Sequence, residues 1–90
     1  MKPIKLSPDV KKKLQDLATK NPAFYNKIQK QLRLFLQNPK HRSLRLHKVT
    51  TAVGSVWSIS IDKGARMLYV EEDLHYYFFR IGTHDQVYRK

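Results

Sequence analysis

The residues of this chain that are able to do chemistry are histidine, arginine, lysine and tyrosine. There is no HExxH motif, no glycine-rich phosphate loop and no cysteine, so we expect neither a metal nor a cofactor. The set suits metal-free cleavage of RNA. In that reaction a base takes the 2′-hydroxyl proton, an acid protonates the leaving 5′-oxygen, and cations stabilise the charged transition state. Histidine titrates close enough to neutrality to do either proton transfer.

The segment Gly82–Tyr88, GTHDQVY, is a candidate for such chemistry. Gly82 is expected to end the last strand, which leaves His84 at the edge of the sheet. If a helical turn begins there, His84 and Tyr88 share one face at i, i+4 spacing. The alternative is a solvated loop histidine and a tyrosine that packs against the protein.

Charge points to the kind of partner. The chain carries 18 Lys and Arg against 7 Asp and Glu, a net charge of +11, and residues 1–48 hold all of the excess. A basic half of this kind favours a nucleic acid, a ribosome or an acidic protein as partner, although a merely solubilising surface is the alternative. No stretch approaches the roughly 20 apolar residues of a membrane span. The N-terminus lacks the apolar core of a signal peptide, so we expect a cytoplasmic protein.

Two helices are expected first, near residues 8–20 and 22–38. Ser7-Pro8 and Asn21-Pro22 are both cap-then-proline helix starts, and apolar residues follow each at helical spacing. Asn38-Pro39 ends the second helix. Because only about two residues join them, the helices should fold back as an antiparallel hairpin.

Strands are expected from residue 44 to about 82. Ile4 and Leu6 could form a very short strand at the start. Leu44 and Leu46 alternate with polar residues, as do Trp57, Ile59 and Ile61, which should face the helices while Ser58 and Ser60 point away. Arg66–Val70 and Tyr76–Ile81 follow after short turns. The 90 residues therefore predict one α+β domain: an N-terminal helical hairpin on one face of a curved, mainly antiparallel sheet of three to five strands, whose other face stays open.

The order of these elements and the run from Leu44 to Tyr88 resemble the RelE/ParE superfamily of toxins. Gly54, Trp57 and Arg66 resemble the family's Gly-x-x-Trp/Tyr strand followed by an arginine on the next strand, and GTHDQVY resembles the ending of YafQ-like members. The resemblance implies a RelE-like fold. It also implies a type II toxin that cleaves mRNA in the ribosomal A site and is blocked by an acidic antitoxin.

The same resemblance assigns roles to individual residues. His84 is similar to the C-terminal catalytic histidine, a candidate general acid. Arg66 is similar to the phosphate-binding arginine, and Tyr88 to the aromatic that orients or stacks on the substrate. His47 lies where members place a basic or histidine residue and is a further catalytic candidate. Lys48, Arg45 and Arg80 are expected to bind RNA phosphates.

Some alternatives stay open. No carboxylate aligns with the base of YoeB-like members, so the general base is unidentified. Arg66 has a competing interpretation as a surface residue in a salt bridge to Glu71 or Glu72. At the level of function, the competing hypotheses are a ParE-like toxin that binds DNA gyrase and a non-catalytic RNA- or protein-binding module of the same fold. The set of His84 with Arg66 argues against the gyrase hypothesis, because ParE-like members generally lack it.

Overall fold

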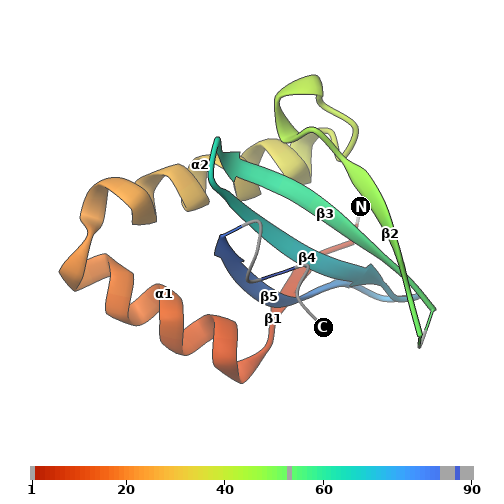
Figure 1. The fold of residues 1–90 in the computed structure, drawn as a ribbon, viewed down its shortest axis with the longest axis horizontal. Helices are drawn as coiled ribbons and strands as arrows, with labels where there is room; N and C mark the ends of the chain where they lie inside the picture. Colours follow the sequence, from red (N-terminus) through yellow and green to blue (C-terminus); the bar gives the residue numbers. More distant parts are fainter. Residues whose placement is uncertain (1, 53, 84–86, 88–90) are drawn as a thin grey trace.

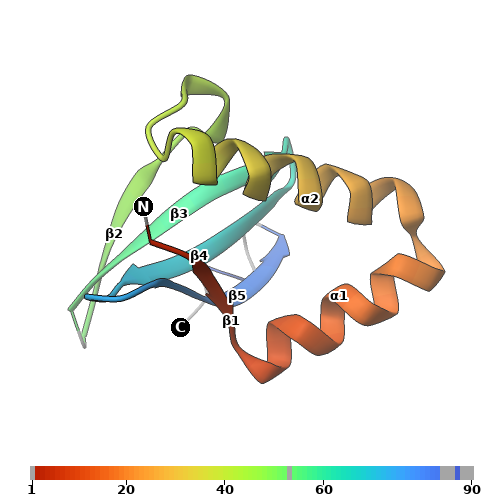
Figure 2. The same ribbon diagram turned by 180° about the vertical axis from the view of Figure 1, so that it is seen from behind.

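Two helices lie on one face of a five-stranded sheet, as Figures 1 and 2 show. The computed structural model describes residues 2–52, 54–83 and 87. Its elements are, in chain order, β1 (Ile4–Leu6), α1 (Pro8–Lys20), α2 (Pro22–Gln37), the short 3-10 helix η1 (Arg42–Leu44), β2 (His47–Thr51), β3 (Gly54–Asp62), β4 (Ala65–Glu71) and β5 (Tyr76–Thr83). Among the described residues, neither helix combines the length and the apolar character that crossing a membrane requires.

Both helices begin where the sequence predicts. Ser7 caps α1 by accepting a hydrogen bond from the amide of Val10 at 3.1 Å, and Asn21 caps α2 by accepting one from the amide of Phe24 at 3.2 Å. Proline occupies the first turn of each helix, where its missing N–H costs nothing. Asn21 alone joins the helices, and α2 ends at Gln37, one residue earlier than predicted. In Figure 2 they diverge from this connection.

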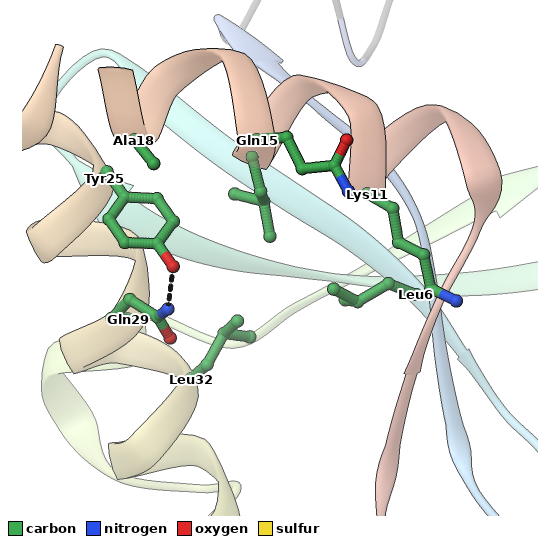
Figure 3. Close-up of a pocket in the computed structure, with 8 residues that line it drawn as sticks. Leu6, Lys11, Gln15, Ala18, Tyr25, Gln29 and Leu32 are labelled. Atoms are coloured by element: carbon green, nitrogen blue, oxygen red, sulfur yellow. Dashed lines mark hydrogen bonds between the residues drawn. The ribbon is translucent and has the colours of Figure 1, made fainter. Parts of the chain in front are cut away.

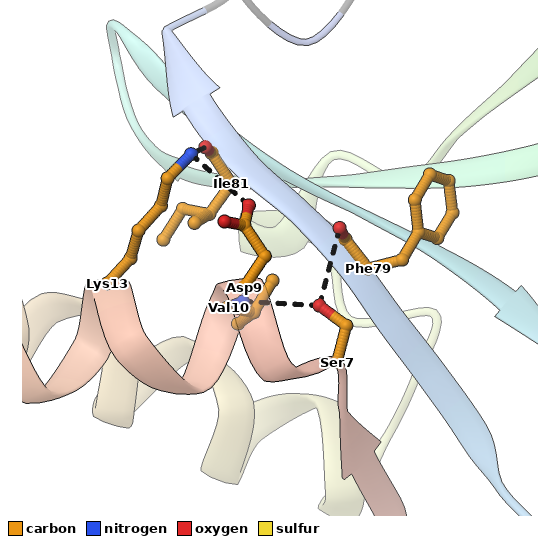
Figure 4. Close-up of polar contacts among 6 residues, drawn as sticks. All are labelled: Ser7, Asp9, Val10, Lys13, Phe79 and Ile81. Carbon is orange, nitrogen blue, oxygen red and sulfur yellow. Dashed lines mark hydrogen bonds and ion pairs between the residues drawn. The ribbon is translucent and has the colours of Figure 1, made fainter.

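The sheet has the strand order β1-β5-β4-β3-β2. Its pairs are antiparallel except that of β1 with β5, which is parallel and sets Ile4 beside Tyr76. The expected mainly antiparallel sheet is therefore confirmed, and the short first strand exists, although its parallel pairing was not predicted. Figure 4 shows how the chain passes from β1 into α1: the Ser7 hydroxyl lies 3.5 Å from the carbonyl oxygen of Phe79.

Two predicted boundaries are wrong. Leu44 does not begin a strand, because it lies in η1, and Arg45 follows in the left-handed region with φ of 46°. The strand begins only at His47. Leu44 and Leu46 mimic strand alternation, but Leu44 is fully buried as part of a helical turn. Nor does Gly82 end the last strand, since it pairs with Arg66 inside β5.

The core lies between the helices and the sheet. Phe35 of α2 meets Tyr69 and Phe78 edge-on, with ring centroids 4.9 and 5.3 Å apart. Ile59 and Ile61 are buried in the same cluster, and the half-buried Trp57 packs against it, so the predicted inward face of β3 is confirmed. Burial is the main cause that raises the pKa of the Tyr69 phenol well above its ordinary value. The phenol therefore stays protonated and uncharged within this core.

The face of the sheet away from the helices, called the outer face below, is only partly open. A second, smaller cluster on it joins Val56 of β3 and Leu68 of β4 to Val87, which is 5% exposed. The expectation of an entirely open face is therefore wrong at this point, because a residue from beyond β5 covers the apolar part. The polar part of the outer face carries Ser58, Ser60 and Arg66.

Candidate functional site

Arg66 is the best-anchored cation of the outer face. It lies on β4 opposite Ser60 of β3, and its side chain reaches diagonally to the next serine of that strand. Nε donates to the hydroxyl oxygen of Ser58. Nη2 donates to the carbonyl oxygen of Ser58 at 3.3 Å and to that of Arg45 at 2.8 Å. The guanidinium is thus held in one orientation by two elements, β3 and the segment after η1.

The alternative salt bridges of Arg66 do not form. Glu71 pairs with Lys2 at 2.6 Å, and Glu72 pairs with the ring of His75 at 2.6 Å. Both carboxylates lie around the turn between β4 and β5, at the other end of β4. Within the described residues, the guanidinium of Arg66 therefore has no carboxylate partner.

The backbone of Arg45 reaches Arg66 because η1 is fixed to the core. Gln31, a buried residue of α2, donates from Nε2 to the carbonyl oxygens of Ser60 at 2.8 Å and Ser43 at 3.3 Å. The fully buried Leu44 anchors the same turn. Arg45 then takes its left-handed conformation, which ends η1 and presents its carbonyl oxygen to Arg66. Gln31 therefore links a core helix to the geometry of the site.

A hollow of about 320 Å³ opens beside Arg66. Its lining consists of Ser43, Arg45, Ser60, Ile61, Asp62, Lys63 and Arg66. This lining contains three cationic side chains and one carboxylate, that of Asp62, which already has other partners. Asp62 accepts from the amide of Gly64 at 2.9 Å and lies 3.8 Å from Nζ of Lys27. Cations without a carboxylate partner are the groups that bind phosphate, so the hollow suits an oxyanion.

His47 is close to this site, and Lys48 is on the other side of the sheet. His47 pairs with Ser58 across β2 and β3. Paired side chains share a face with Cβ atoms about 4.5–5.5 Å apart, so His47 lies next to the serine that holds Arg66. Lys48 pairs with Trp57 and lies 5.8 Å from the centre of its ring. The structure thus groups Arg66, Arg45 and His47 and sets Lys48 apart.

Arg80 belongs to a different hollow. Arg80 pairs with Leu68, which is two residues along β4 from Arg66. It lines a space of about 360 Å³ with Asp9, Lys13 and Ile81. Figure 4 shows Lys13 reaching from α1 to the carbonyl oxygen of Ile81, 3.4 Å away, with Asp9 beside it. The positive charge of Arg80 is therefore near the edge of the sheet beside α1.

His84 and Tyr88 lie outside the described residues. Thr83 and Val87, the described residues nearest to them in sequence, have defined places. Thr83 pairs with Ala65, the residue before Arg66, and Val87 shares an apolar cluster with Leu68, two residues after Arg66. Thr83 and Val87 therefore both lie near the part of β4 that carries Arg66.

A third hollow, of about 450 Å³, lies between the two helices (Figure 3). Leu6 and Leu32 line it together with Tyr25, whose hydroxyl oxygen accepts from Gln29 Nε2 at 2.6 Å. It shares no lining residue with the hollow beside Arg66. It contains no histidine or arginine, so it is not part of the candidate site.

Sequence reasoning did not identify Ser58 and Gln31 as parts of the site. Ser58 carried a usable signal, since strict alternation along β3 puts it on the outer face, two positions from the residue opposite Arg66. Gln31 gave a weaker signal: it is a polar residue on the buried side of an amphipathic helix, and such a residue needs a hydrogen-bond partner. Within the described residues, no three histidine or carboxylate side chains gather as a metal site would require.

Comparison with known proteins gives a likeness of fold. No family model and no curated protein sequence matches the chain. Among solved structures, YafQ from Escherichia coli BL21(DE3) superposes with a TM-score of 0.75 at 20% identity, over 98% of this chain and 99% of that one. A chain of the E. coli DinJ–YafQ complex gives 0.73 at 19% identity, over 98% and 99%. The Staphylococcus aureus YoeB–YefM complex gives 0.71 at 19%, over 93% and 98%. This chain therefore has the RelE-like fold of YafQ and YoeB.

Proposed function

We propose that this protein is the toxin of a type II toxin–antitoxin pair and that it cleaves mRNA bound to the ribosome, without a metal. The observation that carries the proposal is the anchored guanidinium of Arg66 beside a basic hollow on the outer face. The likeness to YafQ and YoeB in fold supports it, as does the sequence resemblance to the RelE superfamily.

The reaction is an internal transesterification of RNA. The 2′-oxygen loses its proton to a base and attacks the adjacent phosphorus, and the 5′-oxygen leaves with a proton from an acid. Arg66 binds the phosphate and stabilises the charge that develops on its oxygens. Arg45 contributes a second cation from the rim of the same hollow, and Lys48 and Arg80 bind flanking phosphates of the message.

Histidines supply the proton transfers in this proposal. His84 is the general acid, and Thr83 and Val87 support this role because both contact the part of β4 that carries Arg66. His47 lies beside Ser58 on the same face and is the remaining candidate for the second proton transfer. Tyr88 stacks on a base and orients the substrate.

An acidic protein is the proposed antitoxin. Its acidic side chains complement the net charge of +11. The complexes of YafQ with DinJ and of YoeB with YefM support a protein partner of this kind. Co-expression of the acidic product of an adjacent gene is expected to restore growth and to give a complex that survives purification. A toxic protein that no such product neutralises would contradict this part of the proposal.

Cleavage of a ribosome-bound message in a purified translation system tests the enzymatic part. We expect the wild-type protein to cut the message and Arg66→Ala to lose the activity with its fold intact, as circular dichroism would show. Arg66→Lys keeps the charge but lacks the planar guanidinium and should remain strongly impaired. An Arg66→Ala variant that cuts at the wild-type rate would remove Arg66 from the site. A folded wild-type protein that leaves the message intact would overturn the enzymatic proposal.

A further inference from the structure

The described hydrogen bonds of Arg66 leave a single nitrogen of its guanidinium unused. Nε has one hydrogen, and Ser58 Oγ accepts it. Nη2 has two, and the carbonyl oxygens of Ser58 and Arg45 accept them at 3.3 and 2.8 Å. Within the described part of the chain, Nη1 makes no hydrogen bond. Its two hydrogens are therefore the ones that a ligand meets first.

This arrangement differs from that of a mobile surface arginine. A flexible arginine presents a fork of two nitrogens to an oxyanion and loses rotamer freedom when it binds. Here Nε and Nη2 are already committed to protein oxygens, so the orientation is set before a ligand arrives. The main acceptor is itself immobile, because Ser58 lies in the middle of β3, is 0% exposed and has a sheet partner on each side.

We propose that Ser58 is a positioning residue for the reaction: its hydroxyl and carbonyl oxygens hold Arg66 so that Nη1 meets the scissile phosphate. The inference rests on the proposed function of Arg66 as phosphate ligand. Ser58 touches no substrate. It acts by restricting the guanidinium of Arg66 to the orientation that binds the phosphate. A displacement of about 1 Å at such a group costs about 10²-fold in rate.

The kinetic experiment compares Ser58→Ala, Arg66→Ala and the double variant in single-turnover cleavage of a ribosome-bound message. Ser58→Ala should slow cleavage by about 10- to 100-fold. In the Arg66→Ala background the same change should have no further effect, because its target is gone. Ser58→Thr keeps the hydroxyl acceptor and suits a strand, so it should recover most of the rate. Independent, multiplicative losses in the double variant would overturn the positioning role.

A second measurement does not depend on catalysis. In ¹⁵N NMR spectra the Arg66 Nε–H should exchange slowly with water in the wild type and rapidly in Ser58→Ala. Ser60→Ala is the matched control: it removes another buried hydroxyl of β3, one that donates to the carbonyl oxygen of Asp62 at 3.0 Å, and should leave the Arg66 signal protected.

The two measurements separate the two claims. If the wild-type Arg66 Nε–H exchanges as fast as that of Ser58→Ala, the inference about Ser58 is wrong, whatever the cleavage assay gives. If the Nε–H is protected but the wild type cuts no message, the proposed function fails while the anchoring of Arg66 by Ser58 stands. Protection together with a non-additive loss of cleavage supports both.

Discussion

Val87 and Leu68 belong to one small apolar cluster on the outer face of the sheet, and Leu68 is two residues along β4 from Arg66. This cluster joins Val87 to β3 and to β4, and β4 carries the anchored guanidinium of Arg66.

Val87→Ala should lower both stability and activity. Removing two buried methyl groups should reduce the free energy of unfolding by about 1–2 kcal/mol, measured by urea denaturation. If His84 is the general acid as proposed, RNA cleavage should fall by at least tenfold, because Val87 follows it by three residues in the sequence. Val70→Ala is the control: it thins the same cluster from β4 and should change stability without a comparable loss of cleavage. Equal losses of cleavage in both variants would contradict the specific role of Val87.

His84→Gln should lose about 10²–10⁴-fold in single-turnover cleavage, the usual effect of removing a general acid, with fold, antitoxin binding and ribosome binding retained. The matched control is His75→Gln. His75 pairs with Glu72 at 2.6 Å at the turn between β4 and β5, so its loss should leave the rate unchanged. Equal rates for wild type and His84→Gln would assign His84 to a solvated loop role.

Gln31→Ala should destabilise the fold by about 1–3 kcal/mol, because it leaves the carbonyl oxygen of Ser60 without its buried donor. Since Gln31 also fixes η1, cleavage should fall as Arg45 loses its support. Gln29→Ala is a control from the same helix. Among the described residues, its amide binds the hydroxyl of Tyr25 in the groove between the helices and no other group, so a smaller destabilisation and full activity are expected. Thermal unfolding and the cleavage assay together distinguish the two glutamines.

Arg45→Gly should separate the backbone of this residue from its side chain. Glycine adopts the left-handed conformation without the cost that a Cβ imposes, so the carbonyl contact to Arg66 should remain and stability should be unchanged or slightly higher. Binding of a non-cleavable RNA should weaken, and the slope of log K against log salt should fall by about 0.7, the value for one lost phosphate contact on a single strand. An unchanged slope would mean that the Arg45 guanidinium does not touch phosphate.

The parts of the fold that local chemistry determines were predictable. Ser7-Pro8 and Asn21-Pro22 place both helix starts, and alternation along β3 identifies its core face, because a cap or a pleat depends on neighbours in sequence. What was missed depends on distant partners. The turn at Leu44 needs Gln31 of α2, and the β1–β5 pair joins residues 72 positions apart, such as Ile4 and Tyr76.

The site divides in the same way. Arg66 and His47 were identified by residue type and by resemblance, and pairing on the sheet brings them to one face. Ser58 was not identified, because alternation along β3 placed it on the outer face but could not show that the Arg66 side chain would bind it. The carbonyl oxygen of Arg45 was not predictable either, since it depends on a left-handed residue where alternation indicated a strand.

The parallel pairing of β1 with β5 has a consequence for how the protein is made. The strand that closes this edge is synthesised before its partner β5, which follows the other described strands in the sequence, so β1 has no strand to pair with until β5 has been made. At about 5–20 residues per second, β1 waits several seconds for Tyr76 to be added. β1 therefore cannot complete the sheet until its partners in β5, Tyr76–Phe78, have been made. The hollow beside Arg66, which needs β3 and β4 in register, is therefore absent from the early nascent chain.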